Sequence, residues 1–192
     1  RKQLSLQGDF PAGSVVMATP RMTWDDTWQK TLAAATVVVI SWMGSSSESK
    51  WLQQALQFLR QAGKPHLLTG SGVDQTDIAV GFRGEAVEAV NHYLLYSGQN
   101  NFRNLWRWLA AEFCGHTEKF SEPRELPWCG IIHPQTNQRI DSLDEYRRMG
   151  GLEPGRPTVG LLIPRDEWIW GDLRHQQLLV KTLQQRGLNV IP

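Results

Sequence analysis

Residues Pro157–Pro192 read PTVGLLIPRDEWIWGDLRHQQLLVKTLQQRGLNVIP, and this stretch decides the expected fold. Its first part, Thr158–Ile163, is a nearly all-apolar run that follows a proline, as is typical of a strand buried on both faces of a sheet. A turn that contains Pro164 and Gly171 comes next, and a helical pattern follows it. Gly187 ends that pattern, where we expect a left-handed C-cap residue.

The helical pattern and the residues after it complete one supersecondary unit. Leu188–Ile191 opens a second strand, so the order is strand, helix, strand, which nearly always builds a parallel sheet. These strands are expected either to complete a sheet built earlier or to open a second α/β domain, in a chain that continues past Pro192 in the native gene. The predicted helix face comprises Leu173, Gln176, Gln177, Val180, Leu183 and Gln184, widened by Leu178 and Leu179.

The N-terminal part alternates strand and helix patterns. The strongest strand signal is Thr36–Trp42 (TVVVISW), whose unbroken apolarity predicts a central strand covered on both faces. Val15–Ala18 and Pro65–Thr69 are weaker strand candidates, and helices are expected before and after Thr36–Trp42. This alternation predicts an α/β fold with a parallel, doubly wound sheet of the flavodoxin or Rossmann type. Two further helices are predicted at Glu85–Tyr96 and Asn100–Cys114.

Several polar positions are interpreted as turn and cap residues. Thr23 is the expected N-cap of the first helix, and Ser46 or Ser47 that of the second. The GSSS loop that starts at residue 44 has a phosphate-binding alternative, but it lacks a P-loop lysine and a GxGxxG spacing. Asp74 and Asp77 have a cation-binding alternative, which is disfavoured because a hard cation requires more oxygen ligands.

Composition excludes several classes of protein. The formal net charge of +1 in 192 residues gives no electrostatic footprint for nucleic acid. Cys114 and Cys129 lie outside any CxxC spacing, so neither zinc nor a disulfide framework is indicated, and a cytoplasmic setting is expected. The sequence has no apolar run long enough to span a membrane. It opens without an initiator Met, which suggests a sequence internal to a larger polypeptide.

Three stretches carry a resemblance to a known family. The stretch Pro157–Pro192 resembles the large subunit of cobaltochelatase (CobN type) and the related H subunit of magnesium chelatase. Tyr93–Phe113 (YLLYSGQNNFRNLWRWLAAEF) resembles the same subunits, and so does Leu126–Pro134 (LPWCGIIHP) followed by Asp141–Tyr146. Within the first stretch the matching residues are Pro157–Ile163, Arg165, Trp168, Gly171 and Gly187–Pro192.

The resemblance implies the N-terminal part of a metal-chelatase large subunit. Such subunits bind the tetrapyrrole, hydrogenobyrinic acid a,c-diamide or protoporphyrin, and cobalt or magnesium, while separate AAA+ subunits hydrolyse ATP. Family subunits are several times longer, and the residues that handle the metal lie beyond this chain, so the chain alone is expected to be inactive. The alternatives are a magnesium chelatase H-type subunit and a non-catalytic docking module for AAA+ partners. A nucleotide- or flavin-binding protein is disfavoured because glycine fingerprints are absent.

The expected domain organisation has three parts. Residues 1–115 form an α/β domain, 116–156 form an irregular connector with a short helix at Ser142–Met149, and 157–192 form the βαβ unit. The connector carries four prolines, which interrupt regular elements.

Candidate site residues are few, because no catalytic constellation is visible. The five histidines show no metal-ligand spacing, so neither catalytic nor metal-binding residues are predicted. The loop Pro164–Asp172 follows a strand, where α/β sheets place ligands. Arg165 and Trp168 in this loop, with His133, are the predicted tetrapyrrole contacts, through bidentate pairing with a carboxylate and through ring stacking. The alternative is a rim loop whose tryptophans pack on a neighbour and in which Asp172 is an N-cap. The family has a His at the position of Glu167.

Overall fold

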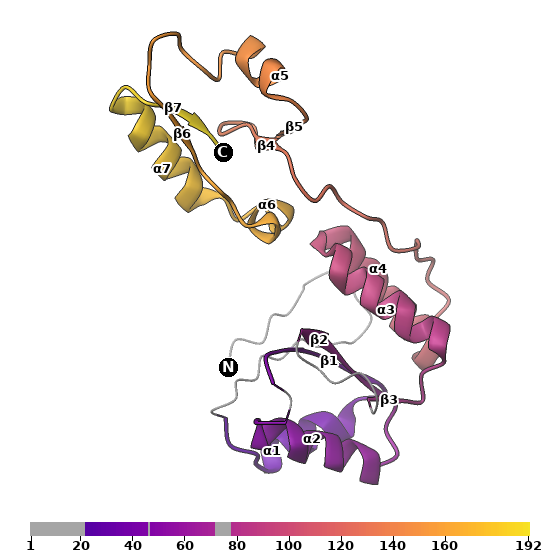
Figure 1. Ribbon diagram of the computed structural model, residues 1–192. Helices are drawn as coiled ribbons and strands as arrows, with labels where there is room; N and C mark the ends of the chain where they lie inside the picture. The colour runs from indigo at the N-terminus through magenta and orange to yellow at the C-terminus, as the bar shows by residue number, and fades with distance from the viewer. Residues whose placement is uncertain (1–21, 46, 72–77) are drawn as a thin grey trace. The chain divides into compact units, whose positions relative to one another are not determined.

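The structure is a computed structural model whose chain divides into two compact units (Figure 1). Unit 1 comprises the described residues up to Leu95 together with Asn101–Pro123, and unit 2 comprises Tyr96–Asn100 and Arg124–Pro192. The strand predicted at Val15–Ala18 lies outside the described residues. So do Ser46, Asp74 and Asp77. The structure describes residues 22–45, 47–71 and 78–192.

Unit 1 is built on a small mixed sheet. Strand β1 (Val38–Met43) pairs in parallel with β2 (His66–Ser71), and β3 (Ala79–Val80) adds to β2 in the antiparallel sense. The strand order is therefore β1-β2-β3, and within the described part of the chain β2 is the central strand. The segment predicted as a strand at Thr36–Trp42 does form one, and its central place in the sheet stays a prediction.

Helices pack against both faces of this sheet. One hydrophobic cluster joins alternate residues of β1 to helices α1 (Asp26–Ala34) and α2 (Lys50–Gln61). A second cluster joins the other set of alternate residues, in and next to β1, to helices α3 (Gly84–Tyr96) and α4 (Gly98–Cys114). Side chains alternate in direction along a strand, so β1 is covered on both faces, as predicted. The doubly wound, parallel architecture stays a prediction, because the described sheet is small and mixed. The β1 residues involved are Val38, Ile40 and Trp42 in the first cluster and Val37, just before β1, with Val39 in the second.

The caps of α1 and α2 differ from those predicted. The N-cap of α1 is Asp25, not Thr23: its carboxylate accepts from the amides of Thr27 at 2.9 Å and Trp28 at 3.0 Å. The N-cap of α2 is Ser49, whose buried hydroxyl accepts from the Leu52 amide at 3.2 Å. The cap therefore lies two residues beyond the predicted Ser47, whose hydroxyl instead bonds that of Ser45.

Tyr93 ties α3 to the segment that follows α4. Its ring is buried, and its hydroxyl donates to the Ser121 carbonyl at 2.6 Å. Burial, with a smaller contribution from the nearby carboxylate of Glu122, raises the pKa of Tyr93 to about 12. The neutral phenol that this pKa maintains is also the form that can donate the hydrogen bond.

Unit 2 holds two small sheets, and the connector is less irregular than predicted. Strands β4 and β5 form an antiparallel hairpin inside it, while the predicted short helix is present and capped by Ser142. The elements of unit 2 are β4 (Ile131–Ile132), β5 (Arg139–Ile140), α5 (Leu143–Arg148), β6 (Thr158–Gly160), α6 (Arg165–Trp170), α7 (Arg174–Gln185) and β7 (Asn189–Ile191).

The predicted strand–helix–strand unit is confirmed. Strands β6 and β7 pair in parallel, with Thr158 opposite Asn189, and Gly187 adopts the predicted left-handed conformation at φ +80°. The first strand of this unit, β6, is nevertheless shorter and less buried than the sequence predicted. It covers three residues, and Leu162 beyond it is 98% exposed. In the described part of the chain β6 and β7 pair only with each other.

Helix α7 packs through a narrower stripe than predicted. Leu173 and Val180 are buried, whereas Leu178 and Leu179 are exposed and do not widen the stripe. Among the described residues, no helix combines the length and apolarity that crossing a membrane requires.

Two polar side chains anchor β7 to the rest of unit 2. Asn189 is buried; its amide group donates to the carbonyls of Glu153 at 2.9 Å and Arg156 at 3.2 Å, and its side-chain oxygen accepts from the Glu153 amide at 2.8 Å. Tyr146 on α5 is also buried, and its hydroxyl donates to the Val190 carbonyl at 2.9 Å. Burial raises the pKa of Tyr146.

Candidate functional site

The stretch predicted as a ligand-binding loop is a short helix. Arg165–Trp170 forms α6, which begins after Pro164 without a side-chain cap and ends at Gly171 in the left-handed conformation at φ +74°. Pro at the start and Gly just past the end are favourable positions for both residues. The N-cap predicted at Asp172 was wrong, because the cap position of α7 is Leu173, which makes no side-chain hydrogen bond there.

Arg165 points its guanidinium at backbone carbonyls. Its Nε donates to the Pro127 carbonyl at 3.0 Å, and its Nη2 donates to the carbonyls of Tyr96 and Leu126, both at 3.1 Å. The guanidinium carbon also lies 4.2 Å from the centre of the Trp128 ring, a cation–π contact. Three of its five N–H groups are therefore engaged, so a ligand carboxylate can meet Nη1 alone unless one of these bonds breaks.

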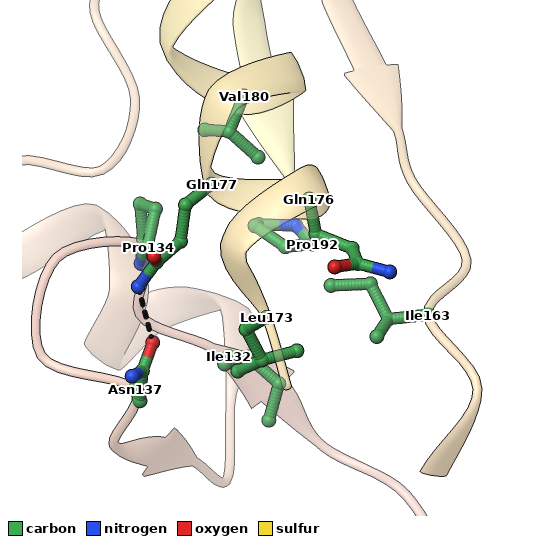
Figure 2. Close-up of a pocket in the computed structure, with 9 residues that line it drawn as sticks. All are labelled: Ile132, Pro134, Asn137, Ile163, Leu173, Gln176, Gln177, Val180 and Pro192. Atoms are coloured by element: carbon green, nitrogen blue, oxygen red, sulfur yellow. Dashed lines mark hydrogen bonds between the residues drawn. The ribbon is translucent and has the colours of Figure 1, made fainter. Parts of the chain in front are cut away.

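Trp168 and α7 meet at the turn of the β4–β5 hairpin. The indole Nε1 of Trp168 donates to the Asn137 carbonyl at 3.1 Å, and the Gln177 amide donates to the Asn137 side-chain oxygen at 2.8 Å. Figure 2 shows the second bond as a dashed line. Asn137 has φ +58°, a left-handed conformation that Asn tolerates better than most residues. One turn residue thus docks both helices on the hairpin.

His133 belongs to the same turn, and its neighbours determine its tautomer. The ring Nδ1 accepts from the amides of Gln135 at 3.3 Å and Thr136 at 3.4 Å, and the His133 carbonyl accepts from the Asn137 amide at 2.9 Å. Because backbone amides can only donate, the neutral ring carries its proton on Nε2. His133 therefore offers a hydrogen-bond donor rather than a metal-ligating lone pair.

A small apolar pocket lies between the hairpin and α7 (Figure 2). Its empty space of about 200 Å³ includes the open mouth, and its enclosed part is only about as large as one water molecule. Pockets that enclose drug-sized ligands measure about 300–1,000 Å³, so this pocket has room for a methyl-sized group and not for a macrocycle. The lining residues are Ile132, Pro134, Asn137, Ile163, Leu173, Gln176, Gln177, Val180 and Pro192.

The predicted contact residues are only partly brought together. Trp168 and His133 converge on the turn around Asn137, whereas Arg165 is committed to carbonyls elsewhere in unit 2. Asn137 and Asn189 were not predicted from the sequence. An Asn in a polar turn and an Asn that opens a buried strand were the available signals, since each needs local hydrogen-bond partners. No group of three or more His, Cys, Asp or Glu that could hold a metal ion occurs in the described ranges.

These features define a polypeptide of helices with small sheets, in which parallel strand pairs recur in both units. The chain belongs to the CobN/magnesium chelatase family, whose family model matches residues 91–192. The resemblance that the sequence motifs carry is therefore confirmed.

Individual relatives agree with this assignment. The chain is 26% identical over 168 residues to the aerobic cobaltochelatase subunit CobN of Pseudomonas aeruginosa, covering 85% of this chain and 13% of that protein. It is 25% identical over 113 residues to the chloroplastic magnesium-chelatase subunit ChlH of Oryza sativa subsp. indica, covering 52% of this chain and 8% of that protein. The chain thus spans about an eighth or less of the length of these relatives.

A solved structure shares the fold. The catalytic subunit of cobaltochelatase from Mycobacterium tuberculosis superposes with a TM-score of 0.52 and 21% sequence identity, covering 88% of this chain and 13% of that one.

Proposed function

We propose that this chain is the N-terminal part of the large subunit of an ATP-dependent tetrapyrrole metal chelatase that inserts cobalt into a corrinoid precursor. The family match over residues 91–192 carries the proposal. Cobalt is favoured over magnesium because the alignment with the cobaltochelatase subunit covers 85% of the chain, against 52% for the magnesium-chelatase subunit. Magnesium insertion into protoporphyrin is the alternative.

Within such a subunit, the face around the β4–β5 turn is proposed to contact the edge of the tetrapyrrole. The half-buried Trp168 offers a ring face for stacking, and His133 offers an Nε2–H donor to a peripheral carboxylate or carbonyl. Arg165 offers only Nη1, a single-atom contact in place of the bidentate pairing first expected. In this proposal the adjacent pocket takes one methyl-sized apolar substituent of the macrocycle.

The whole subunit is proposed to work with AAA+ partner subunits that supply ATP hydrolysis. Exposed apolar side chains favour a docking role as the second candidate function for this chain: Leu162 is 98% exposed and Trp128 is 53% exposed. The chain itself carries no Walker motif, so it is expected neither to bind nor to hydrolyse ATP. Calorimetric binding of ATP at or below about 10 μM, about −7 kcal/mol, would contradict this expectation. The cytoplasmic location stays a prediction.

Quenching of tryptophan fluorescence by a water-compatible porphyrin or corrinoid precursor tests the tetrapyrrole contact. Trp168→Ala is expected to weaken the affinity by about 1–3 kcal/mol, about 5- to 150-fold, if the ring is buried against the ligand. Trp170→Ala is the matched control on the same helix, because Trp170 is exposed. Saturable quenching that neither substitution changes would move the contact elsewhere. Weaker pull-down of AAA+ subunits without a change in ligand affinity would favour the docking role.

A further inference from the structure

Arg165 joins two stretches of unit 2 that are far apart in sequence. Its Nη2 bonds the carbonyl of Tyr96, which is 69 residues earlier, and also that of Leu126, 39 residues earlier. Its Nε bonds the carbonyl of Pro127. One planar group therefore holds the end of α3 and the segment that enters unit 2 after Pro123.

These two stretches are the connections between the units. The chain passes from unit 1 into unit 2 at Tyr96, returns after Asn100, and enters unit 2 again at Arg124. Arg165 thus bonds a carbonyl in each of the two segments that make up unit 2, close to the residues at which the chain passes between the units. Because every contact lies inside unit 2, the arrangement is a property of that unit alone.

The first connection is a sharply bent junction in close contact with α6. Ser97 and Gly98 both have left-handed backbones, at φ +61° and +87°. A Cβ on Gly98 would lie 2.7 Å from Cγ2 of Ile169 and 3.1 Å from Cδ1 of Leu126, so only glycine fits without displacing them. A non-glycine residue such as Ser97 persists in this conformation where its surroundings hold it there.

The guanidinium makes no ion pair within the described ranges. Its hydrogen-bonded partners are neutral carbonyls, and it also lies 4.2 Å from the centre of the Trp128 ring. Hydrogen bonds from a charged donor are about twice as strong as neutral ones, and Arg can spread them over several acceptors in fixed geometry. A lysine at this position keeps the charge but has one donor atom, which cannot reach three carbonyls in the same way.

We infer that Arg165 is a latch that couples the two inter-unit connections, so that a disturbance of either one loosens both. The latch comprises Arg165, Trp128 and the carbonyls of Tyr96, Leu126 and Pro127. It is a positioning device, and it is independent of the activity proposed above.

Hydrogen exchange of the whole chain, followed by mass spectrometry, tests the latch. In Arg165→Lys, exchange is expected to rise about tenfold or more in 97–101 and in 126–130 together, while the amides of β7 keep their wild-type rates. Arg174→Lys is the matched control, an exposed arginine on α7 whose exchange pattern is expected to equal that of the wild type. A rise in only one stretch, in neither, or uniformly through unit 2 would overturn the inference.

A second pair of variants tests the coupling itself. Ser97→Val disturbs the first connection through its backbone, because a β-branched residue is strained at φ +61°, and it adds no Cβ at Gly98, where one would touch Leu126. It is expected to raise exchange in 126–130 as well, since coupling between two sites is reciprocal. In the Arg165→Lys background, Ser97→Val is expected to add nothing at 126–130. If Arg165→Lys does not fold, Trp128→Ala takes its place and should produce a smaller rise in both stretches. An unchanged first connection in Trp128→Ala would refute the latch.

Discussion

The two parallel strand pairs, β1–β2 in unit 1 and β6–β7 in unit 2, are stabilised by different chemistry. The first pair lies between two hydrophobic clusters, one of which holds Trp28, Trp42 and Trp51 in edge and stacked ring contacts. The second pair carries the nearly fully exposed Leu162 just past β6, and buried polar groups of Asn189 and Tyr146 hold its β7 strand.

The difference shows that the same local pattern does not imply the same burial. Both regions show an apolar run, a helix and a glycine, and both form a parallel pair. Apolar cover on both faces depends on elements elsewhere in the chain, and unit 1 obtains it from four helices. In unit 2, side-chain hydrogen bonds to backbone groups do part of this work, and their geometry must be satisfied because buried polar groups left unpaired are costly.

The largest contrast is expected between two leucine substitutions. Leu59→Ala in α2 removes a fully buried side chain and should lower the free energy of unfolding by about 2–5 kcal/mol. Leu162→Ala after β6 removes an exposed one and should change it by less than about 0.5 kcal/mol. Urea unfolding measures both. A similar cost for the two substitutions would mean that Leu162 is covered in solution, and the contrast between the strand pairs would then fail.

The polar anchor of β7 is expected to have the next largest effect. Asn189→Ala removes the group that bonds Glu153 and Arg156 and should cost about 1–3 kcal/mol, because the part-buried backbone groups of these two residues lose their partner. Asn189→Asp keeps an acceptor for the Glu153 amide, but it places a buried carboxylate oxygen against the carbonyls of Glu153 and Arg156, so at neutral pH it is expected to cost at least as much as Asn189→Ala. Gln185→Ala, at an exposed position on α7, is the control. Equal stability of Asn189→Ala and the wild type would mean that the hydrogen bonds of Asn189 do not stabilise β7.

A helix cap in unit 1 should have a smaller effect. Ser49→Ala removes the buried acceptor at the start of α2 and should cost about 0.5–2 kcal/mol. Ser47→Ala, two residues earlier and exposed, should stay within about 0.5 kcal/mol of the wild type. Thermal or urea unfolding of the two variants compares them directly. A larger loss of stability in Ser47→Ala than in Ser49→Ala would indicate that Ser47 caps α2, as the sequence predicted.

The smallest effect at neutral pH is expected for Tyr93→Phe, about 0.5–1.5 kcal/mol for the lost bond to Ser121. The pKa of Tyr93 is raised to about 12 in the folded chain, above the value of 10.0 for an exposed phenol. Stability is therefore complete below pH 10 and decreases as the pH rises towards 12, since the unfolded phenol loses its proton first. Urea unfolding between pH 9 and 12 should show a shallower decline for Tyr93→Phe. Parallel declines would contradict the raised pKa.

Local features of the fold followed from the sequence because they depend on neighbouring residues. The helices at Gly84–Tyr96 and Gly98–Cys114, the short helix at Leu143–Arg148 and the left-handed Gly187 follow from periodicity, from charge placement and from turn chemistry. The helix at Arg165–Trp170 was missed because Pro164 and Gly171 suggested a turn. Those residues equally mark the two ends of a short helix.

The candidate site was less predictable, because its contacts span long sequence distances. Arg165 was selected for its charge in a stretch after a strand, but its partners lie 38 to 69 residues away. Periodicity carries no information on which carbonyls a guanidinium will meet. His133 was selected as an exposed imidazole, while the amides that fix its tautomer depend on the hairpin turn, which the prolines of the connector concealed.

The bond between Arg165 and the Tyr96 carbonyl has a consequence for the order of events during synthesis. At about 5–20 residues per second, the 69 residues between them take about 3–14 s to be translated, far longer than the microseconds in which a helix forms. The α3–α4 junction is therefore made well before the side chain that secures it exists. During that interval the nascent chain carries a bent, unsecured junction, and closure of unit 2 must await the emergence of α6 from the ribosome.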